Sequence, residues 1–132
     1  MAASYTNKNL AAVEDSAPRF GLGESQEARF ANAALETEQT GLSYHRLKAG
    51  KRQGFAHRHE EAEEVYVVIS GSGRVKLDGD IVELERLDAV RVSPDVTRSF
   101  EAGDEGLELL AFGPRRADDR GEIVQGWWVD ES

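Results

Sequence analysis

Residues 57–73 read HRHEEAEEVYVVISGSG, and this stretch decides the fold of the chain. His57 and His59, two of the three histidines, stand one residue apart before a run of carboxylates and an apolar run that ends at glycine. Successive side chains of a strand point to opposite faces, so the two imidazoles share one face. Glu64 and Tyr66 share a face of a following strand in the same way. If these two strands are antiparallel neighbours, both imidazoles and the Glu64 carboxylate converge.

Short segments bounded by Gly, Asp, Asn or Pro lie on both sides of this stretch, a pattern typical of an all-β sandwich or barrel. An Asp-Gly pair at 78–79 separates two alternating segments and predicts a hairpin over residues 74–84, because glycine accepts a positive φ at little cost. No fixed-period repeat and no long amphipathic helix pattern interrupts the segments. We therefore expect an all-β fold with strands at residues 41–47, 54–59, 64–69, 73–77, 81–84, 89–92, 97–101 and 107–112.

Composition and charge narrow the class of protein and its partners. The chain has 132 residues, of which 39% are hydrophobic and 31% charged, which predicts a soluble folded protein with a single core. Lys and Arg total 16 against 25 Asp and Glu, and the net charge of -9 repels phosphate backbones and anionic membrane surfaces. We therefore expect neither nucleic acid nor a membrane as a partner. The first twenty residues contain no apolar run of signal-peptide or membrane-spanning length, which favours a cytoplasmic protein.

The chain divides into one domain with two flanking segments. We expect an N-terminal arm at residues 1–27, with a helical turn near residues 9–13, a barrel at residues 28–113 and a C-terminal tail at residues 114–132. The tail is polar until Trp127 and Trp128, whose rings are costly to leave in water. We expect these rings to cover the barrel or a partner subunit.

Two histidines and one carboxylate form a complete facial ligand set for a divalent transition metal, with positions left for water, oxygen or substrate. The chain has no cysteine, so any metal must be bound by His, Asp or Glu. His57, His59 and Glu64 are therefore a candidate site for Fe, Mn, Ni or Zn. His45, in the segment LSYHRL, is a reserve ligand.

The same residues carry a family resemblance. The spacing H-x-H, four residues, Glu, six residues, Gly resembles the first conserved motif of the cupins, here filled by His57, His59, Glu64 and Gly71. The resemblance covers approximately residues 42–112 and implies a cupin-like jelly-roll β-barrel. Because cupins commonly dimerise, it also implies a homodimer.

The segment LDAVRVSPDVTRSF, residues 87–100, resembles the second cupin motif in outline. Asp88 and Pro94 match that motif, whereas Leu87 and Asp95 stand where it has glycines. Arg98 stands where the resemblance places the family's third metal-binding histidine. The resemblance therefore implies a metal site that has lost one ligand.

Arg98 decides how much of the family's function can be transferred. Val96, Arg98 and Phe100 share one face by strand parity, so Arg98 is expected to point into the barrel. A guanidinium stays protonated and offers only donors, so it cannot replace an imidazole as a ligand. Its charge at about 5 Å from a divalent ion would cost several kcal/mol even at an effective dielectric constant of about 20. We expect an inward Arg98 to pair with Glu64 or to bind an anionic ligand.

The sequence leaves two functional classes open, and with them the question of whether the chain is an enzyme. In the first, the barrel binds a small anionic molecule through inward polar side chains, namely His57, His59, Tyr66 and Arg98. In the alternative, the chain is a metal-dependent enzyme of the dioxygenase or isomerase type. The metal would then lie on the two histidines and Glu64, with Arg98 as the substrate anchor. A third option is a barrel retained for its interactions alone.

Overall fold

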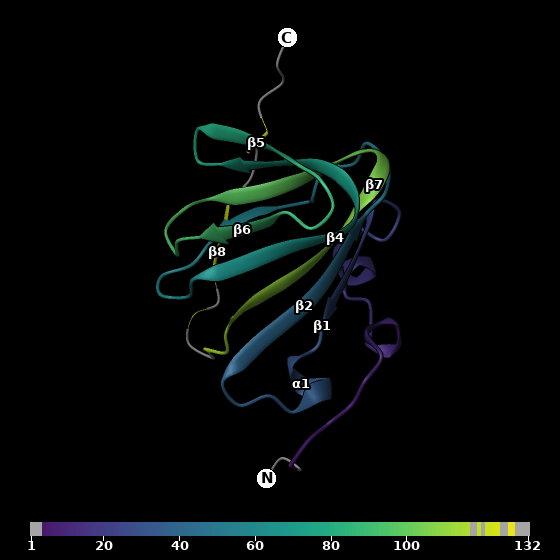
Figure 1. Cartoon of the computed structure of the whole chain (residues 1–132), viewed down its shortest axis with the longest axis vertical. Coiled ribbons are helices and arrows are strands. Elements are labelled where there is room, and N and C mark those ends of the chain that lie inside the picture. The colour runs from purple at the N-terminus through teal and green to yellow at the C-terminus, as the bar shows by residue number, and fades with distance from the viewer. Residues whose placement is uncertain (1–3, 117–118, 120, 125–126, 129–132) are drawn as a thin grey trace.

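The computed structural model describes residues 4–116, 119, 121–124 and 127–128, and Figure 1 shows them as a curled sheet. The strands are β1 Gln26–Phe30, β2 Thr40–Leu47, β3 Ala56–Arg58, β4 Glu64–Leu77, β5 Asp80–Leu84, β6 Ala89–Val92, β7 Arg98–Pro114 and β8 Glu122–Val124. The helical elements of these residues are short: η1 Leu10–Ala12, η2 Ala17–Phe20 and α1 Asn32–Leu35. All recorded strand pairs are antiparallel. The predicted all-β jelly-roll barrel is confirmed.

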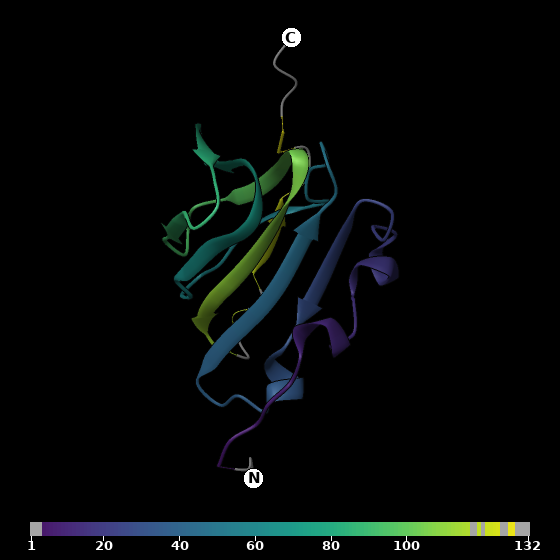
Figure 2. The same cartoon turned by 45° about the vertical axis from the view of Figure 1, so that its right-hand side comes forward.

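The two long strands β4 and β7 run through the centre of the curled sheet, and they pair with each other over two separate blocks of residues (Figure 2). Residues 65–71 of β4 pair with residues 107–112 of β7, and residues 73–77 pair with residues 98–102. The register shifts between these two blocks. The four strands expected at 64–69, 73–77, 97–101 and 107–112 are therefore the halves of two continuous strands, and the prediction of separate strands was wrong.

Gly71 lies at this register shift, where its backbone closely approaches that of β7. Its φ is 78°, in the left-handed region that favours glycine. A Cβ added to Gly71 would lie 2.0 Å from the carbonyl oxygen of Gly106, which itself has a φ of 81°. The glycine that completes the histidine motif is therefore required by the close approach of the two paired strands.

Two turns place a left-handed backbone on residues other than glycine. The predicted hairpin is confirmed by the pairing of Leu77 with Asp80, but the positive φ of 50° falls on Asp78 and not on Gly79. Leu87, which stands where the second cupin motif has a glycine, has a φ of 73°. The turn before β6 thus keeps a glycine-like backbone, at a cost of about 1 kcal/mol in strain.

Strands β3 and β8 build the side of the barrel where the histidines lie. His57 of β3 pairs with Arg98 of β7, and residues 56–58 pair with β8. On the far side of β7, β2 pairs with β7 and β1 pairs with β2. Neither β1 nor β8 was expected from the sequence. As an edge strand, β1 pairs with residues 43–47 of β2, and β8 pairs with the whole of β3.

The buried core is formed by side chains of β2, β4, β5, β6 and β7. Its members are mostly β-branched, leucine and aromatic side chains from alternate positions of the strands. The buried cluster contains Leu47, Tyr66, Val68, Val75, Leu84, Val92, Phe100, Ala102, Leu107, Leu109 and Ala111. Phe100 is fully buried.

Trp127 and Trp128 pack on the barrel of their own chain. Trp128 Nε1 donates to Ser99 Oγ at 3.2 Å, and the Arg52 guanidinium lies 4.8 Å from the centre of the Trp128 ring. Lys76 Nζ donates to the Trp127 carbonyl at 2.7 Å. These contacts place Trp127 and Trp128 against the barrel, and packing of the tail on a partner subunit stays a prediction.

Among the residues that the structure describes, no helix combines the length and apolarity that a membrane-spanning helix needs. A cytoplasmic location stays a prediction.

Candidate ligand and metal site

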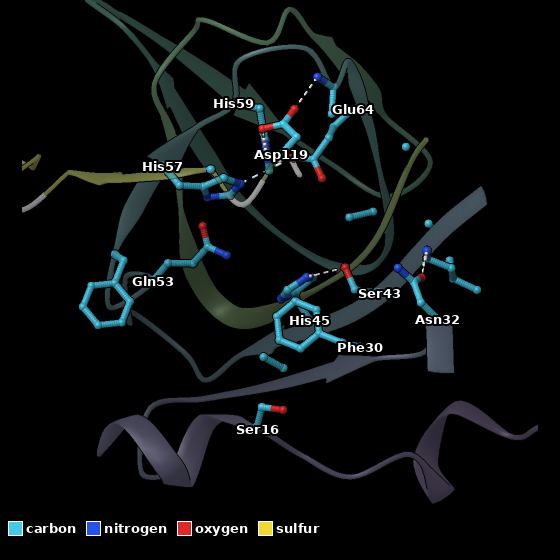
Figure 3. Close-up of a pocket in the computed structure, with 18 of the residues that line it drawn as sticks. Ser16, Phe30, Asn32, Ser43, His45, Gln53, His57, His59, Glu64 and Asp119 are labelled. Carbon is cyan, nitrogen blue, oxygen red and sulfur yellow. Dashed lines mark hydrogen bonds and ion pairs between the residues drawn. The ribbon is translucent and has the colours of Figure 1, made fainter. Parts of the chain in front are cut away.

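A cavity of about 660 Å³ lies inside the barrel, lined by β1 and β2 on one side and by β3, β8 and the tail on the other (Figure 3). Its size lies within the roughly 300–1,000 Å³ of small-molecule sites. The apolar part of the wall includes the rings of Phe20, Phe30 and Phe55. The titratable groups include His45, His57, His59, Glu64 and Asp119.

His57 and His59 turn their imidazoles toward the Glu64 carboxylate (Figure 3). The two rings stand edge to face with centroids 5.2 Å apart. Nε2 of each histidine lies 3.4 Å from Glu64 Oε1. The convergence predicted from strand parity is therefore present.

The strand arrangement that brings the two histidines and Glu64 together differs from the expected one. No pairing of β3 with β4 is recorded among the described strands, and both pair with β7 instead. His57 lies opposite Arg98 at the beginning of β7, whereas Glu64 begins the half of β4 that pairs with the end of β7. The histidines and the carboxylate therefore meet across the interior of the barrel, and the expectation of neighbouring strands was wrong.

Arg98 lies behind Glu64 and is fully buried, as strand parity predicts for an inward side chain. Its Nη2 donates to Glu64 Oε1 at 2.7 Å, and its Nε donates to the Tyr66 hydroxyl at 3.1 Å. Nη1 donates to the carbonyl oxygens of Val96 at 2.8 Å and Pro94 at 3.3 Å. Tyr66 completes the network by donating its hydroxyl to Glu64 Oε1 at 2.6 Å. Arg98 thus takes the first of its two expected roles, a pair with Glu64.

These donors set the charge of the site. Burial alone would raise the pKa of Glu64, but hydrogen bonds from His57, His59 and Tyr66 and the charge of Arg98 together hold that pKa well below its usual range. Burial and the adjacent carboxylate raise the pKa of Tyr66. At neutral pH the site therefore holds an ionised carboxylate against a neutral phenol and a guanidinium.

Asp119 holds His59 through the other ring nitrogen. Its Oδ1 lies 3.2 Å from His59 Nδ1, and its carboxylate accepts the backbone N–H groups of Glu60 at 3.2 Å, Glu61 at 3.0 Å and Ala62 at 2.7 Å. Burial would raise the pKa of Asp119, but these hydrogen bonds lower it well below its usual range. An ionised Asp119 therefore fixes both the imidazole of His59 and the loop that follows it.

The donor set fits a divalent transition metal. Ligand atoms of His57, His59 and Glu64 all lie within 4.8 Å of one another. Metal–ligand bonds of about 2.1 Å separate neighbouring ligands by roughly 3.0–3.4 Å, which matches the two distances of 3.4 Å from imidazole nitrogen to carboxylate oxygen. The opposing factor is the guanidinium of Arg98, which already holds the carboxylate oxygen that a metal would use.

The sequence-predicted ligand contacts divide into two groups. His57 and His59 line the cavity, whereas Arg98 and Tyr66 are not among its lining residues. These two side chains reach the cavity only through Glu64, and their direct contact with a ligand stays a prediction. His45, the reserve ligand, does line the cavity, but its Nε2 lies 2.8 Å from Ser43 Oγ and it stands outside the converging group.

Asp119 and the side-chain amides of the cavity wall were missed by sequence reasoning. Asp119 lies in a polar tail with no motif, and its partner His59 is 60 positions away in the chain. Gln26 lies in the segment expected to be an arm, and Gln53 precedes the motif. No spacing pattern connects these residues to the histidines, so only the fold reveals them.

Replacing Arg98 with Leu is expected to lower the free energy of unfolding by about 3–5 kcal/mol, because it leaves the Glu64 carboxylate partly buried without its countercharge. The control is Arg91→Leu, which removes an exposed ion pair of 3.3 Å with Glu63 and should cost less than about 1 kcal/mol. Urea unfolding followed by circular dichroism measures both. Equal losses in the two variants would contradict the buried network.

Comparisons with known proteins agree with this architecture. A cupin protein from Bacteroides fragilis is 22% identical, with a TM-score of 0.70 over 98% of this chain and 99% of that one. A structure from Silicibacter pomeroyi, described as a sugar phosphate isomerase from a cupin superfamily, is 16% identical, with a TM-score of 0.72 over 91% and 82% of the two chains.

A salicylate 1,2-dioxygenase from Pseudaminobacter salicylatoxidans is 21% identical with a TM-score of 0.66, and the match covers 81% of this chain but 34% of that one. At these identities the structural likeness shows the fold alone. No curated protein matches the chain significantly. The family model described as a cupin domain matches residues 43–113, more than half of the chain. The chain belongs to the cupin family.

Proposed function

We propose that the chain binds a small anionic molecule in the cavity of its barrel, at the site formed by His57, His59 and Glu64 and modified by Arg98. The observation that carries this proposal is the convergence of the two imidazoles on a carboxylate at the wall of a cavity of about 660 Å³. The ionised carboxylate is already matched by a buried guanidinium. A ligand in the cavity can therefore contact two imidazoles whose positions are fixed by the Glu64 carboxylate.

Arg98 and Tyr66 act in this proposal through Glu64. Both donate to the same carboxylate oxygen and neither lines the cavity. Their role is then to fix the position and charge of Glu64, which in turn orients His57 and His59. The histidines, whose side chains are 32% and 15% exposed, can contact the ligand together with other polar groups of the cavity wall.

The names of two structural neighbours are consistent with an anionic ligand. A sugar phosphate and salicylate, which name the substrates of those two proteins, are anions at neutral pH. Because the identities are below 25%, the names support the chemical class of the ligand by analogy only.

The alternative is a metal-dependent enzyme of the dioxygenase or isomerase type, favoured by the ligand-like spacing of His57, His59 and Glu64. A bound Fe, Mn, Ni or Zn would supply Lewis-acid or redox chemistry there. In that function the chain's own residues would hold the metal ligands in position, since Asp119 fixes His59 and Tyr66 fixes Glu64. Arg98 would have to leave Glu64 in order to anchor a substrate.

Elemental analysis of purified, tag-free protein by plasma mass spectrometry distinguishes the two functions. We expect little transition metal in the parent protein and close to one ion per chain in Arg98→His, because that change replaces a repelling charge with an imidazole. Folded samples are selected by circular dichroism. The double variant His57→Ala/Arg98→His is the control and should lose the metal again. Near-stoichiometric metal in the parent, lost in His57→Ala, would overturn the first function in favour of the enzyme.

We also propose a homodimer, with a surface at the mouth of the cavity. Phe20, Phe30 and Ile123 line the cavity and are 63%, 56% and 61% exposed, which is unfavourable for large apolar side chains left in water. Size-exclusion chromatography with light scattering should give twice the chain mass at micromolar concentration, and Phe30→Asp should shift it to the monomer mass. A monomeric parent under these conditions would remove the proposal.

A further inference from the structure

Two glutamine side chains in the cavity wall have fixed orientations. Gln26 Oε1 accepts the backbone N–H of Gly54 at 2.8 Å, and Gln53 Oε1 accepts the backbone N–H of Phe100 at 3.0 Å. A side-chain amide has its oxygen and its NH₂ group on opposite sides, so a bond to the oxygen decides where the NH₂ group points. Both glutamines line the cavity, and no partner is recorded for either nitrogen within the described residues. Figure 3 shows Gln53 below His57 with its amide nitrogen toward the open middle.

Asn32 repeats this arrangement on the β2 side of the cavity. Its Oδ1 accepts the backbone N–H of Leu42 at 2.8 Å, and Figure 3 shows its nitrogen turned toward Ser43. Asn32 and Ser43 both line the cavity. A third amide therefore presents a donor, while its acceptor is used by the backbone.

Ser43 adds a fourth donor through its contact with His45. Burial lowers the pKa of His45 to about 4, so the imidazole is neutral and carries one N–H. Its Nδ1 is buried without a partner in the described chain, and its Nε2 lies 2.8 Å from Ser43 Oγ. A buried N–H without an acceptor costs more than a bare lone pair, so the proton belongs on Nε2 and is donated to Ser43. The Ser43 hydroxyl hydrogen is then available to a ligand.

Most of the carboxylate oxygens of the cavity wall are, by contrast, already used as acceptors. Glu64 Oε1 accepts from Arg98 and Tyr66, and the two oxygens of Asp119 accept three backbone N–H groups. The polar groups left for a ligand are therefore mainly donors. A ligand that satisfies them must present acceptors, and ionised acceptors make the strongest such hydrogen bonds.

The apolar part of the wall limits the rest of the ligand. Phe55 and Phe20 pack edge to face at 6.4 Å, and Phe30 packs edge to face on His45 at 5.7 Å. All four rings line the cavity. They form a surface that suits a flat or compact apolar body.

We propose that the ligand of this cavity is a small carboxylate with an apolar body, whose carboxylate accepts hydrogen bonds from the amide NH₂ groups of Gln53 and Gln26. Asn32 and Ser43 donate to a second acceptor of the same molecule. The body packs on the phenylalanine rings. This inference rests on the proposed binding function and names its ligand class and the residues that select it.

The test uses benzoate, benzamide and inorganic phosphate as probes, with isothermal titration calorimetry and amide chemical shifts on the full chain. The variant is Gln53→Glu, because its carboxylate can still accept the Phe100 N–H while it replaces the donor facing the cavity with an anionic oxygen. Gln26→Glu applies the same change at the second glutamine and serves if the first variant fails to fold. The matched control is Gln39→Glu, at an exposed position that is not part of the cavity lining.

We expect benzoate to bind the parent at least about tenfold more tightly than benzamide, and Gln53→Glu to weaken benzoate at least about tenfold, a change of about 1.4 kcal/mol or more. Gln39→Glu should bind as the parent does. Equal binding of benzamide would overturn both the ligand class and the preference for an anion, whereas benzoate binding that is unchanged in both glutamine variants would overturn the ligand class while the binding function stands. Binding of phosphate alone would do the same. A parent that binds none of the three probes would remove the proposed function and this inference with it.

Discussion

The pair between the Arg98 guanidinium and the Glu64 carboxylate, 2.7 Å apart, is the interaction on which the rest of the site depends. Arg98 has no exposed surface, and within the described chain its other hydrogen bonds go to Tyr66 and to two backbone carbonyls. A charge in this position would be very costly without a partner. Glu64 provides that partner and thereby stays ionised, which in turn lets one oxygen face both imidazoles. Removing either member would change the charge that His57 and His59 meet.

This pair also explains why the cavity and the metal-like cluster favour different ligands. Two imidazoles and a carboxylate at this spacing suit a divalent cation, but the charge of the carboxylate is already neutralised by a buried guanidinium. The amides of the cavity wall present donors, because backbone N–H groups hold their oxygens. An incoming anion therefore meets donors in front and a neutralised carboxylate behind. The chain keeps the shape of a cupin metal site while its charge distribution favours an anion.

Much of this arrangement could be predicted from the sequence, for identifiable physical reasons. Strand alternation placed His57 and His59 on one face and turned Arg98 inward, because side-chain direction depends only on local backbone geometry. The all-β class followed from short alternating segments. The continuity of β4 and β7 could not be predicted, because Gly71 and Gly106 resemble turn residues although they mark a close approach of two long paired strands. Asp119 and the fixed amides were also beyond reach, since their partners lie far away in the chain.

The most direct measurement of the central claim is the titration of Glu64 by carbon NMR. Protein labelled with ¹³C at the glutamate carboxyl is compared with Glu64→Gln to assign the resonance, and spectra are followed from pH 8 to about pH 3. A carboxyl whose pKa is depressed in the folded state stabilises the fold above its ordinary pKa, and that contribution is lost only as the pH falls toward the depressed value. We therefore predict a resonance that stays at the ionised position across this range while the protein is folded. A step with a midpoint near the ordinary glutamate value of about 4.3 would contradict the account.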